Sequence, residues 1–140
     1  MAANGADDSL ATVLDFAAAL DGDDFEHVAR LLDDDVVYLI DGVTHRGPDA
    51  VVASYRQGSA AARRIFDHVE FTHSVVSRDG DTFRVDFSDR LTADDEAFHH
   101  HSIQDITVDR HGLVVGIVDQ PVVGQRDRLE EFMARHARRR

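Results

Sequence analysis

The stretch "FRVDFSDRL", which begins at Phe83, constrains the fold more than any other part of the sequence. Apolar residues occupy alternate positions, with Val85 and Phe87 following Phe83. Successive side chains of a strand point to opposite faces of a sheet, so these three side chains must share the buried face. Asp89 is the next residue in the same alternation, so its side chain is expected on the same face. The pattern therefore predicts a strand that brings a carboxylate to the inside of the protein.

The stretch "FHHHSIQDITV", which begins at Phe98, shows a second alternation. Ile106 and Val108 have the parity of Phe98, which predicts that all three side chains point inward. Three polar residues of the same parity are then expected to face the interior as well: His100, Ser102 and Gln104.

A third stretch, "LVVGIVDQPVV", carries one carboxylate, Asp119, in an otherwise apolar run. Asp119 shares the parity of Val115 and Ile117, which predicts that it also points inward. An ionised group removed from water costs several kcal/mol unless it is paired or hydrogen-bonded. Two strands thus bring a carboxylate to one face, which favours a pocket that uses both. The alternative is that Asp89 and Asp119 lie solvated and unused at its mouth.

The opposite face of the second stretch carries His99, His101 and Asp105. His99 and His101 can form a two-histidine metal site, but an exposed pair at a sheet surface or subunit interface is the interpretation we favour. We therefore expect no metal. Together with Ile103, these residues give the outer face a mixed polar and apolar character, and we expect a homodimer to form through it.

The N-terminal half predicts helices, whereas the rest alternates like sheet. Ser9 can cap a helix that continues to about Leu20, and after the break "DGDD" Asp24 can cap a second helix. The remaining expected elements are a strand over 33–42, a helix that begins near Pro48, strands near 68–78, 82–92, 97–109 and 113–120, and a basic tail or helix over 123–140. Helices followed by antiparallel strands indicate an α+β fold, with one domain over 9–122 and a disordered N-terminus over 1–8.

The composition excludes several classes of function. The chain has 140 residues, which suits one domain, and no cysteine, so disulfides and thiolate sites are impossible. Its net charge is −12, and six of its 15 basic residues lie after Gly124, so the body of the domain repels nucleic acid. No phosphate-binding loop, dinucleotide fingerprint or nucleophile elbow occurs, and we expect no cofactor. Without a membrane-spanning run or an export signal, we expect a cytoplasmic protein with no membrane partner.

Three segments, taken in order, resemble the nuclear-transport-factor-like (NTF2-like, SnoaL-like) superfamily: "ALDGDDFEHVARLLDDDVVY", "RGPDAVVASYRQG" and "VDRHGLVVGIVD". The resemblance covers roughly residues 9–122. It implies a cone-shaped domain in which a curved, mixed but mostly antiparallel sheet packs on three N-terminal helices. Members include ketosteroid isomerases, polyketide cyclases, limonene-epoxide hydrolases, dehydratases and non-catalytic binding modules, so the fold does not fix the function.

The segment "GDTFRVDFSDRLTA" is similar to a strand of limonene-epoxide hydrolase. This likeness implies that Asp89 is a general acid, that Asp119 is a general base, and that Tyr38 holds a water molecule. Two positions depart from that enzyme. Phe87 stands where it has the arginine that links the two acids, and Ile40 stands where it has a water-binding asparagine.

The segments "YRQG" and "DRHG" look like ketosteroid isomerase. However, Phe16 falls where that enzyme's oxyanion tyrosine would be, and Gln104 falls where its protonated acid would be. Ile40 occupies the position of its base, with Asp41 one residue out of register. We therefore do not expect steroid isomerisation by that mechanism.

Together these features predict a cofactor-independent enzyme that acts on an apolar small molecule by general acid–base catalysis, of the epoxide-hydrolase, isomerase or cyclase type. Asp119 would be the base, Asp89 the acid and Tyr38 an orienting hydrogen-bond partner. The expected substrate-binding residues are His100, Gln104, Phe16, Phe83, Phe87, Ile117, Ile40 and His73. The alternative is a non-catalytic ligand-binding or dimerisation module, in which Phe87 and Ile40 mark lost catalytic polarity.

Overall fold

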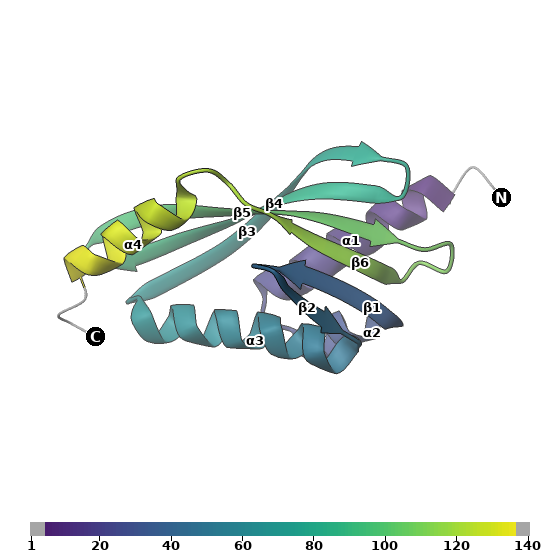
Figure 1. Cartoon of the computed structure of the whole chain (residues 1–140), viewed down its shortest axis with the longest axis horizontal. Helices are drawn as coiled ribbons and strands as arrows, with labels where there is room; N and C mark the ends of the chain where they lie inside the picture. Colours follow the sequence, from purple (N-terminus) through teal and green to yellow (C-terminus); the bar gives the residue numbers. More distant parts are fainter. Residues whose placement is uncertain (1–4, 137–140) are drawn as a thin grey trace.

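The computed structural model describes residues 5–136 (Figure 1). The helices in this part of the chain are α1 (Gly5–Asp21), α2 (Phe25–Arg30), α3 (Pro48–Ile65) and α4 (Gln125–His136). The strands are β1 (Leu32–Ile40), β2 (Val43–Arg46), β3 (His68–Asp79), β4 (Thr82–Ala93), β5 (Glu96–Val108) and β6 (Val114–Gln120).

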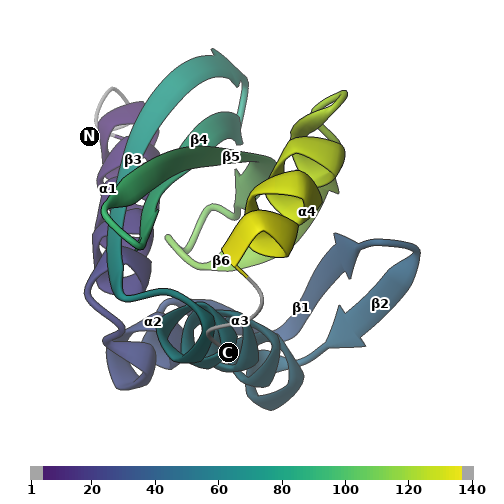
Figure 2. The same cartoon turned by 90° about the vertical axis from the view of Figure 1, so that its left-hand side faces the viewer.

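The strands form one six-stranded sheet in the order β2-β1-β6-β5-β4-β3. β1 pairs with β6 in parallel, whereas every other neighbouring pair is antiparallel. Figure 2 shows that the sheet is strongly curved. The predicted α+β fold, with a mostly antiparallel sheet and three helices from the N-terminal half, is confirmed.

Local sequence sets several of the boundaries. Asp24 caps α2, as predicted, because its carboxylate accepts a hydrogen bond from the backbone N–H of His27 (3.3 Å). α3 begins at Pro48, whose fixed φ suits the first turn of a helix. α1 begins at Gly5 rather than at Ser9, so its first turn replaces part of the expected disordered segment. Residues 1–4 and 137–140 of the two predicted terminal segments lie outside the described residues.

The β1–β2 hairpin was not predicted. Asp41 and Gly42 both have positive φ (53° and 76°), the backbone geometry of a type I′ turn between antiparallel strands. The predicted strand over 33–42 included both residues as its end, whereas they form the turn that leads into β2. An Asp-Gly pair between two extended segments is the signal that would have identified this hairpin.

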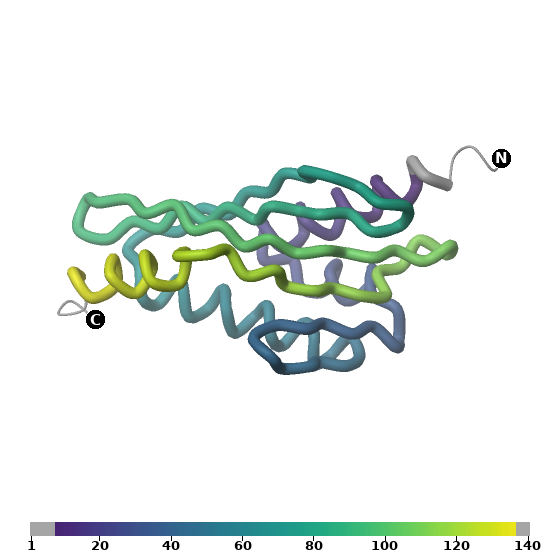
Figure 3. Tube along the Cα trace, turned by 45° about the horizontal axis from the view of Figure 1, so that its top comes forward, coloured from purple at the N-terminus to yellow at the C-terminus, as the bar shows by residue number. Residues whose placement is uncertain are grey.

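Two apolar clusters fill the concave side of the sheet. The first packs α1 against the start of β4, the end of β5 and the strands beside them, and includes Val13, Phe16, Val36, Phe83, Val85, Ile106, Val114 and Ile117. The second packs α4 against the far ends of β3 and β4 and contains Phe66, Val69, Leu91, Ala93 and Phe132. Figure 3 shows α4 beside the β4–β5 turn, whereas α1 begins near the β3–β4 turn at the opposite end.

A bulge in β6 corrects one predicted orientation. Thr107 pairs with Gly116 but Val108 pairs with Val114, so the register shifts by one residue between them. Val114 is fully buried and takes the inward place that the alternation assigned to Val115, so that prediction was wrong. Beyond the bulge the alternation holds, and Ile117 is fully buried. None of the helices within residues 5–136 is long and apolar enough to cross a bilayer.

We expect the substitution Phe16→Ala to lower the free energy of unfolding by about 3–5 kcal/mol, because a fully buried ring would be replaced by a cavity. Urea unfolding followed by circular dichroism measures this change. Val123→Ala is the control: its side chain is 95% exposed, and its loss should change stability by less than about 0.5 kcal/mol. Equal effects of the two substitutions would contradict the assignment of Phe16 to the core.

Candidate functional site

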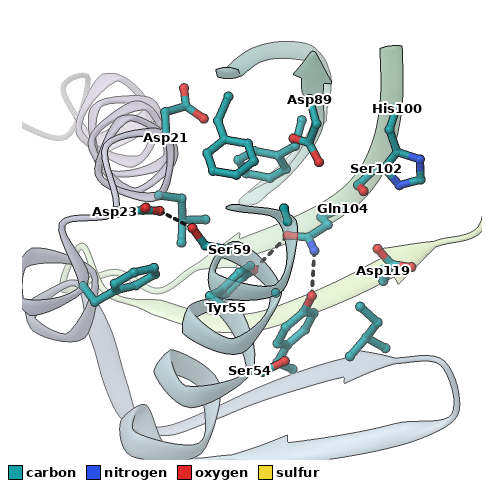
Figure 4. Close-up of a pocket in the computed structure, with 18 residues that line it drawn as sticks. Asp21, Asp23, Ser54, Tyr55, Ser59, Asp89, His100, Ser102, Gln104 and Asp119 are labelled. Atoms are coloured by element: carbon teal, nitrogen blue, oxygen red, sulfur yellow. Dashed lines mark hydrogen bonds between the residues drawn. The ribbon is translucent and has the colours of Figure 1, made fainter. Parts of the chain in front are cut away.

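A cavity of about 260 Å³ lies on the concave side of the sheet (Figure 4). Its apolar and aromatic wall consists of Leu20, Phe25, Tyr38, Ile40, Tyr55, Gly58, Ala62, Phe71 and Phe87. Its polar wall consists of Asp21, Asp23, Ser54, Ser59, Asp89, His100, Ser102, Gln104 and Asp119. Among the described residues, no arginine side chain belongs to this wall. The cavity therefore has one wall rich in aromatic side chains and another that carries four carboxyl groups.

The inward-facing rows of β4 and β5 explain why a cavity forms at this place. On β4 the row passes from Val85 in the first apolar cluster, through Phe87 and Asp89 in the cavity wall, to Leu91 in the second cluster. On β5 the corresponding row runs through Ile106, Gln104, Ser102, His100 and Phe98. Polar side chains in the middle of a row cannot join either cluster without an unpaired burial penalty. The space between the clusters consequently stays open.

Gln104 joins two tyrosines in the cavity wall. The Tyr55 hydroxyl donates to Gln104 Oε1 (2.8 Å), and Gln104 Nε2 donates to the Tyr38 hydroxyl (2.8 Å). The two tyrosine rings stack with their centroids 4.9 Å apart. Burial raises the pKa of Tyr38 and of Tyr55 well above the usual range, so both hydroxyls keep their protons. Because the Tyr38 oxygen accepts from Gln104, its own proton can be donated to a bound ligand.

Asp119 pairs with Gln104 in the β5–β6 ladder, and both side chains face the cavity. Burial is the main cause that raises the pKa of Asp119, and the charge of Asp41 adds to it. A hydrogen bond from Gln104 and the charge of Arg126 act in the opposite direction. Asp119 is thus a partly desolvated carboxylate whose ionised form is supported by one amide donor.

Asp89 lies on the other side of the cavity (Figure 4). Burial first, and the negative charge of Asp21 second, raise the pKa of Asp89 to about 7, while His101 opposes this shift. Among the described residues, Asp89 forms no hydrogen bond or ion pair that would favour its ionised form. At neutral pH a substantial fraction of this carboxyl group is therefore protonated.

His100 pairs with Asp89 in the β4–β5 ladder and also lines the cavity. Burial, followed by the charge of His101, lowers the pKa of His100, so the ring is neutral at neutral pH. Its Nδ1 atom is buried without a hydrogen-bond partner in the described part of the protein. A neutral imidazole with unused hydrogen-bonding capacity thus lies next to the protonated carboxyl group.

The acidic side of the cavity was missed by the sequence analysis, which treated "DGDD" as a helix break. Asp23 accepts hydrogen bonds from Ser59 Oγ (2.8 Å) and from Arg63 Nε (2.8 Å). Asp21 is the last residue of α1, and its Oδ2 atom lies 2.6 Å from Nδ1 of His73. The cavity-facing side of α3 was also missed, although Tyr55 and Ser59 continue the helical spacing that Val51 begins.

The structure places the predicted site residues in three groups. The cavity wall contains Asp119, Asp89, Tyr38, His100, Gln104, Phe87 and Ile40. Phe16, Phe83 and Ile117 do not line it, because they are fully buried in the first apolar cluster, and this corrects the prediction that they form part of the pocket. His73 does not line the cavity either; it contacts the wall residue Asp21.

The described residues contain no group of three or more histidine, aspartate or glutamate side chains arranged to bind a metal ion. Outside the cavity, His101 Nδ1 lies 3.0 Å from Asp86, and the backbone N–H of His101 donates to Gln125 (2.6 Å). His101 is therefore held in the outer surface of the sheet, whereas its neighbour His99 is exposed.

Solved structures with the same arrangement of elements include an LEH-like epoxide hydrolase from Mycobacterium tuberculosis, which is 22% identical, with a TM-score of 0.63 over 93% of this chain and 92% of that one. TerC co-crystallised with polyporic acid is 13% identical, with a TM-score of 0.67 over 91% and 98%. A Mycobacterium tuberculosis protein in complex with estradiol-17β-hemisuccinate is 18% identical, with a TM-score of 0.63 over 84% and 96%.

No protein-family model matches the sequence, and no curated protein matches it significantly. The structural likenesses nevertheless show that the chain has the NTF2-like fold, which confirms the fold that the sequence resemblance implied. Proteins of this fold include epoxide hydrolases, cyclases and ligand binders.

We expect Gln104→Leu to lower the free energy of unfolding by about 1–3 kcal/mol, because both tyrosine hydroxyls would lose a buried hydrogen-bond partner. Chemical denaturation measures the loss. Gln57→Leu makes the same chemical change at an exposed position of α3 and should leave stability within about 0.5 kcal/mol. A variant at position 104 as stable as the wild type would rule out the proposed hydrogen-bonded connection.

Proposed function

We propose that the chain is a cofactor-independent enzyme that acts on an apolar small molecule, with Asp119 as general base and Asp89 as general acid. One observation carries this proposal. Two carboxyl groups with raised pKa values line one cavity that also has an aromatic wall, and no arginine belongs to its described lining. Such an environment suits a neutral ligand better than an anionic one, because four carboxyl groups line the cavity and no arginine does among the described residues.

The surroundings of the two carboxyl groups assign their roles. Asp119 accepts a hydrogen bond from Gln104, which favours the ionised form that a base needs. Asp89 has no such donor and keeps its proton to about pH 7, which is the form that an acid needs. Two carboxyl groups in one pocket whose environments separate their protonation states are a recurrent arrangement for acid–base chemistry.

Asp89 and Asp119 lie on the two strands that flank β5, and both side chains reach the same cavity. Their partners on β5, His100 and Gln104, are four residues apart, so the two carboxyl groups approach the cavity from different positions along that strand. A small molecule bound between them would present one reacting atom to Asp119 and another to Asp89. The Tyr38 hydroxyl, next to Gln104, would hold a ligand oxygen or the attacking water.

For an epoxide, the proposed reaction proceeds as follows. Asp119 removes a proton from water while the water oxygen forms a bond to one ring carbon. The bond from that carbon to the ring oxygen breaks, and Asp89 gives its proton to the departing oxygen. Asp119 then returns its proton by way of solvent to Asp89, and both groups regain their starting forms. For an isomerisation or a cyclisation, Asp119 would take its proton from carbon instead.

Epoxide opening has the support of the LEH-like neighbour and of the three matching positions Asp89, Asp119 and Tyr38. Phe87 and Ile40 support the second candidate, a non-catalytic binding module. Both are apolar and line the cavity at positions where limonene-epoxide hydrolase carries polar groups. Two proteins of the same fold were solved with small organic ligands, polyporic acid and estradiol-17β-hemisuccinate, and binding of a small molecule fits either candidate.

We expect Asp119→Asn to lower turnover of a true substrate by about 10²–10⁴-fold, because it keeps the shape of the side chain but removes its basicity. Screening epoxides, unsaturated ketones and polyketide-like esters with the wild type identifies the substrate for this measurement. Thermal stability should stay the same or rise, because a partly desolvated charge is removed. Asp89→Asn should also impair turnover, since the proton donor is lost.

Asp109→Asn is the matched control, because this carboxylate lies in the β5–β6 turn, outside the cavity wall. Full turnover by Asp119→Asn would overturn the catalytic assignment. A much lower melting temperature for Asp119→Asn would identify Asp119 as a structural residue and favour the binding module.

The plot of reaction rate against pH should be bell-shaped, and the rate should fall as the pH rises through about 7. The pKa of Asp89 is raised to about 7, so its protonated, acid form is lost as the pH rises through that value. The pKa of Asp119 is also raised above its usual value, chiefly by burial, so its ionised, basic form is lost as the pH falls through that raised pKa. Initial rates between pH 4 and 9 test this, and the falling limb should disappear in Asp89→Asn. A rate that keeps rising to pH 9 would exclude Asp89 as the acid.

We also propose that two copies of the chain pair through the outer face of the sheet, around His99, His101, Ile103 and Asp105. Arg84 holds Asp105 through two hydrogen bonds (2.8 and 3.0 Å), so this face is ordered before any contact. The partly exposed Ile103 supplies an apolar centre. A pre-ordered polar surface around an apolar side chain suits an interface between identical subunits.

Light scattering at neutral pH should give twice the mass of one chain. Ile103→Asp should convert the protein to the monomer, because it places a charge at the centre of the proposed interface. Leu14→Asp, which introduces the same charge on α1, should leave the mass unchanged. A wild-type mass equal to one chain at every concentration would refute the dimer.

A further inference from the structure

The end of α1 carries a carboxylate whose position helix formation does not explain. Asp21 is the last residue of α1, where the helix dipole is negative and disfavours another negative charge. No basic residue lies in the last turn of this helix to compensate. Asp21 is held instead by a residue from another element, His73 of β3, across 2.6 Å. Both side chains are about four-fifths buried, with 19% and 21% exposed.

This pair directs Asp21 into the cavity. Asp21 belongs to the cavity wall, whereas His73 does not. Its Oδ2 atom is held by His73, and Figure 4 shows Asp21 beside α1 and Asp89 on the neighbouring strand, both at the edge of the same cavity. α1 packs against β4, the strand that carries Asp89. A carboxyl group held in place by a histidine therefore lines the same cavity as the proposed acid.

We propose that Asp21, held by His73, is a positioning residue that keeps the proton on Asp89 at neutral pH. This inference rests on the proposed function in so far as Asp89 is the acid. Two like charges in one poorly hydrated space repel each other strongly, so ionisation of Asp89 beside an ionised Asp21 is unfavourable. Asp21 touches neither carbon nor oxygen of the reacting group in this scheme, and it acts through Asp89 alone.

The other groups around Asp89 do not replace Asp21 in this role. His100, directly opposite on β5, is neutral because burial lowers its pKa. His101 and Asp86 contact each other on the outer face of the sheet and act on Asp89 in opposite directions. Phe71, its partner on β3, is uncharged. After burial itself, Asp21 is the largest influence that raises the pKa of Asp89.

The test is to follow the carboxyl carbon of Asp89 by NMR during a pH titration of the wild type and of variants. Asp21→Asn and Asp21→Ser both remove the charge, and either variant that folds should lower the titration midpoint of Asp89 by roughly one pH unit. The falling limb of the pH–rate profile should move to lower pH by the same amount. Asp23→Asn is the matched control: Asp23 also lines the cavity, but Ser59 and Arg63 hold it, and its loss should leave the Asp89 midpoint in place.

Variants of His73 separate positioning from direct proton transfer. His73→Asn keeps an N–H donor near the place of Nδ1, so it should retain the wild-type midpoint of Asp89, whereas His73→Ala should lower it because Asp21 is released. An Asp89 midpoint that does not move in either Asp21 variant overturns the proposal. So does complete loss of turnover in His73→Asn with an unchanged midpoint, since His73 would then transfer protons itself.

The titration and the activity assay can fail independently. A lowered midpoint in the Asp21 variants supports the inference about the proton even if no compound is turned over, in which case the proposed enzyme activity fails. An unmoved midpoint, together with a large loss of turnover in Asp119→Asn, leaves the enzyme activity standing and rejects the role of Asp21.

Discussion

The rest of the structure depends on the interruption of two apolar rows by polar side chains. On β4 and β5 the inward positions are apolar at both ends and polar or mixed in the middle, where Asp89, His100 and Gln104 lie. The apolar side chains at one end of the rows are buried under α1, and those at the other end under α4. Burial of apolar surface stabilises the fold by about 25 cal/mol for each Å² removed from water. The polar side chains in the middle of the rows would gain nothing from such contacts and would lose their hydration. The sheet therefore packs at two places and stays open between them.

The cost of that opening is reduced by hydrogen bonds within the wall. Gln104 is the most buried polar residue of the cavity, at 4% exposed, and its amide serves both tyrosines as well as Asp119. Its side chain can accept at one end and donate at the other, which suits a place between a tyrosine donor and a carboxylate. A glutamate there would face Asp119 with a second negative charge, and a leucine would leave the hydroxyls unpaired. The wall is thus stable and polar at the same time.

Alternation along the strands predicted most of the fold and the main features of the site. It identified the inward side of β4 and β5 because a one-residue slip would bury every charged neighbour, so the register has a single low-energy solution. It failed at Val115, where a bulge changes the phase without a signal in the hydrophobic pattern. It also assigned too many residues to the pocket. Phe16 and Phe83 have the correct direction, but direction alone does not tell a packed core from an open cavity.

The parts of the site that were missed come from contacts between elements distant in the sequence. Asp21 and His73 are separated by 52 positions, and neither residue has a local pattern that reveals the other. Tyr55 is joined to Gln104 across 49 positions. Such contacts depend on how α1 and α3 lie over the sheet, which is decided by packing and not by the propensity of either segment. The sequence predicted the strand residues of the site well because the sheet itself aligns them.

The second apolar cluster links the cavity to the last helix. Phe71 and Ala62 line the cavity and also pack against this cluster, which includes Phe132 of α4. α4 is fastened at its end by His136, whose ring nitrogens lie 2.6 Å from Asp94 and 2.9 Å from Glu96 in the β4–β5 turn.

Asp94 first, and Glu96 as well, raise the pKa of His136, so this attachment is complete when the histidine is protonated and weakens as the pH rises through its raised pKa. The carboxyl group of Asp89, at the other side of the same wall, loses its proton as the pH rises through about 7. A rise in pH consequently adds a buried charge to the cavity while it loosens the helix that supports one end of the wall. A pH near neutral or slightly below it, where Glu96 is still ionised, therefore favours both the packing around the cavity and the protonation state that its proposed acid requires.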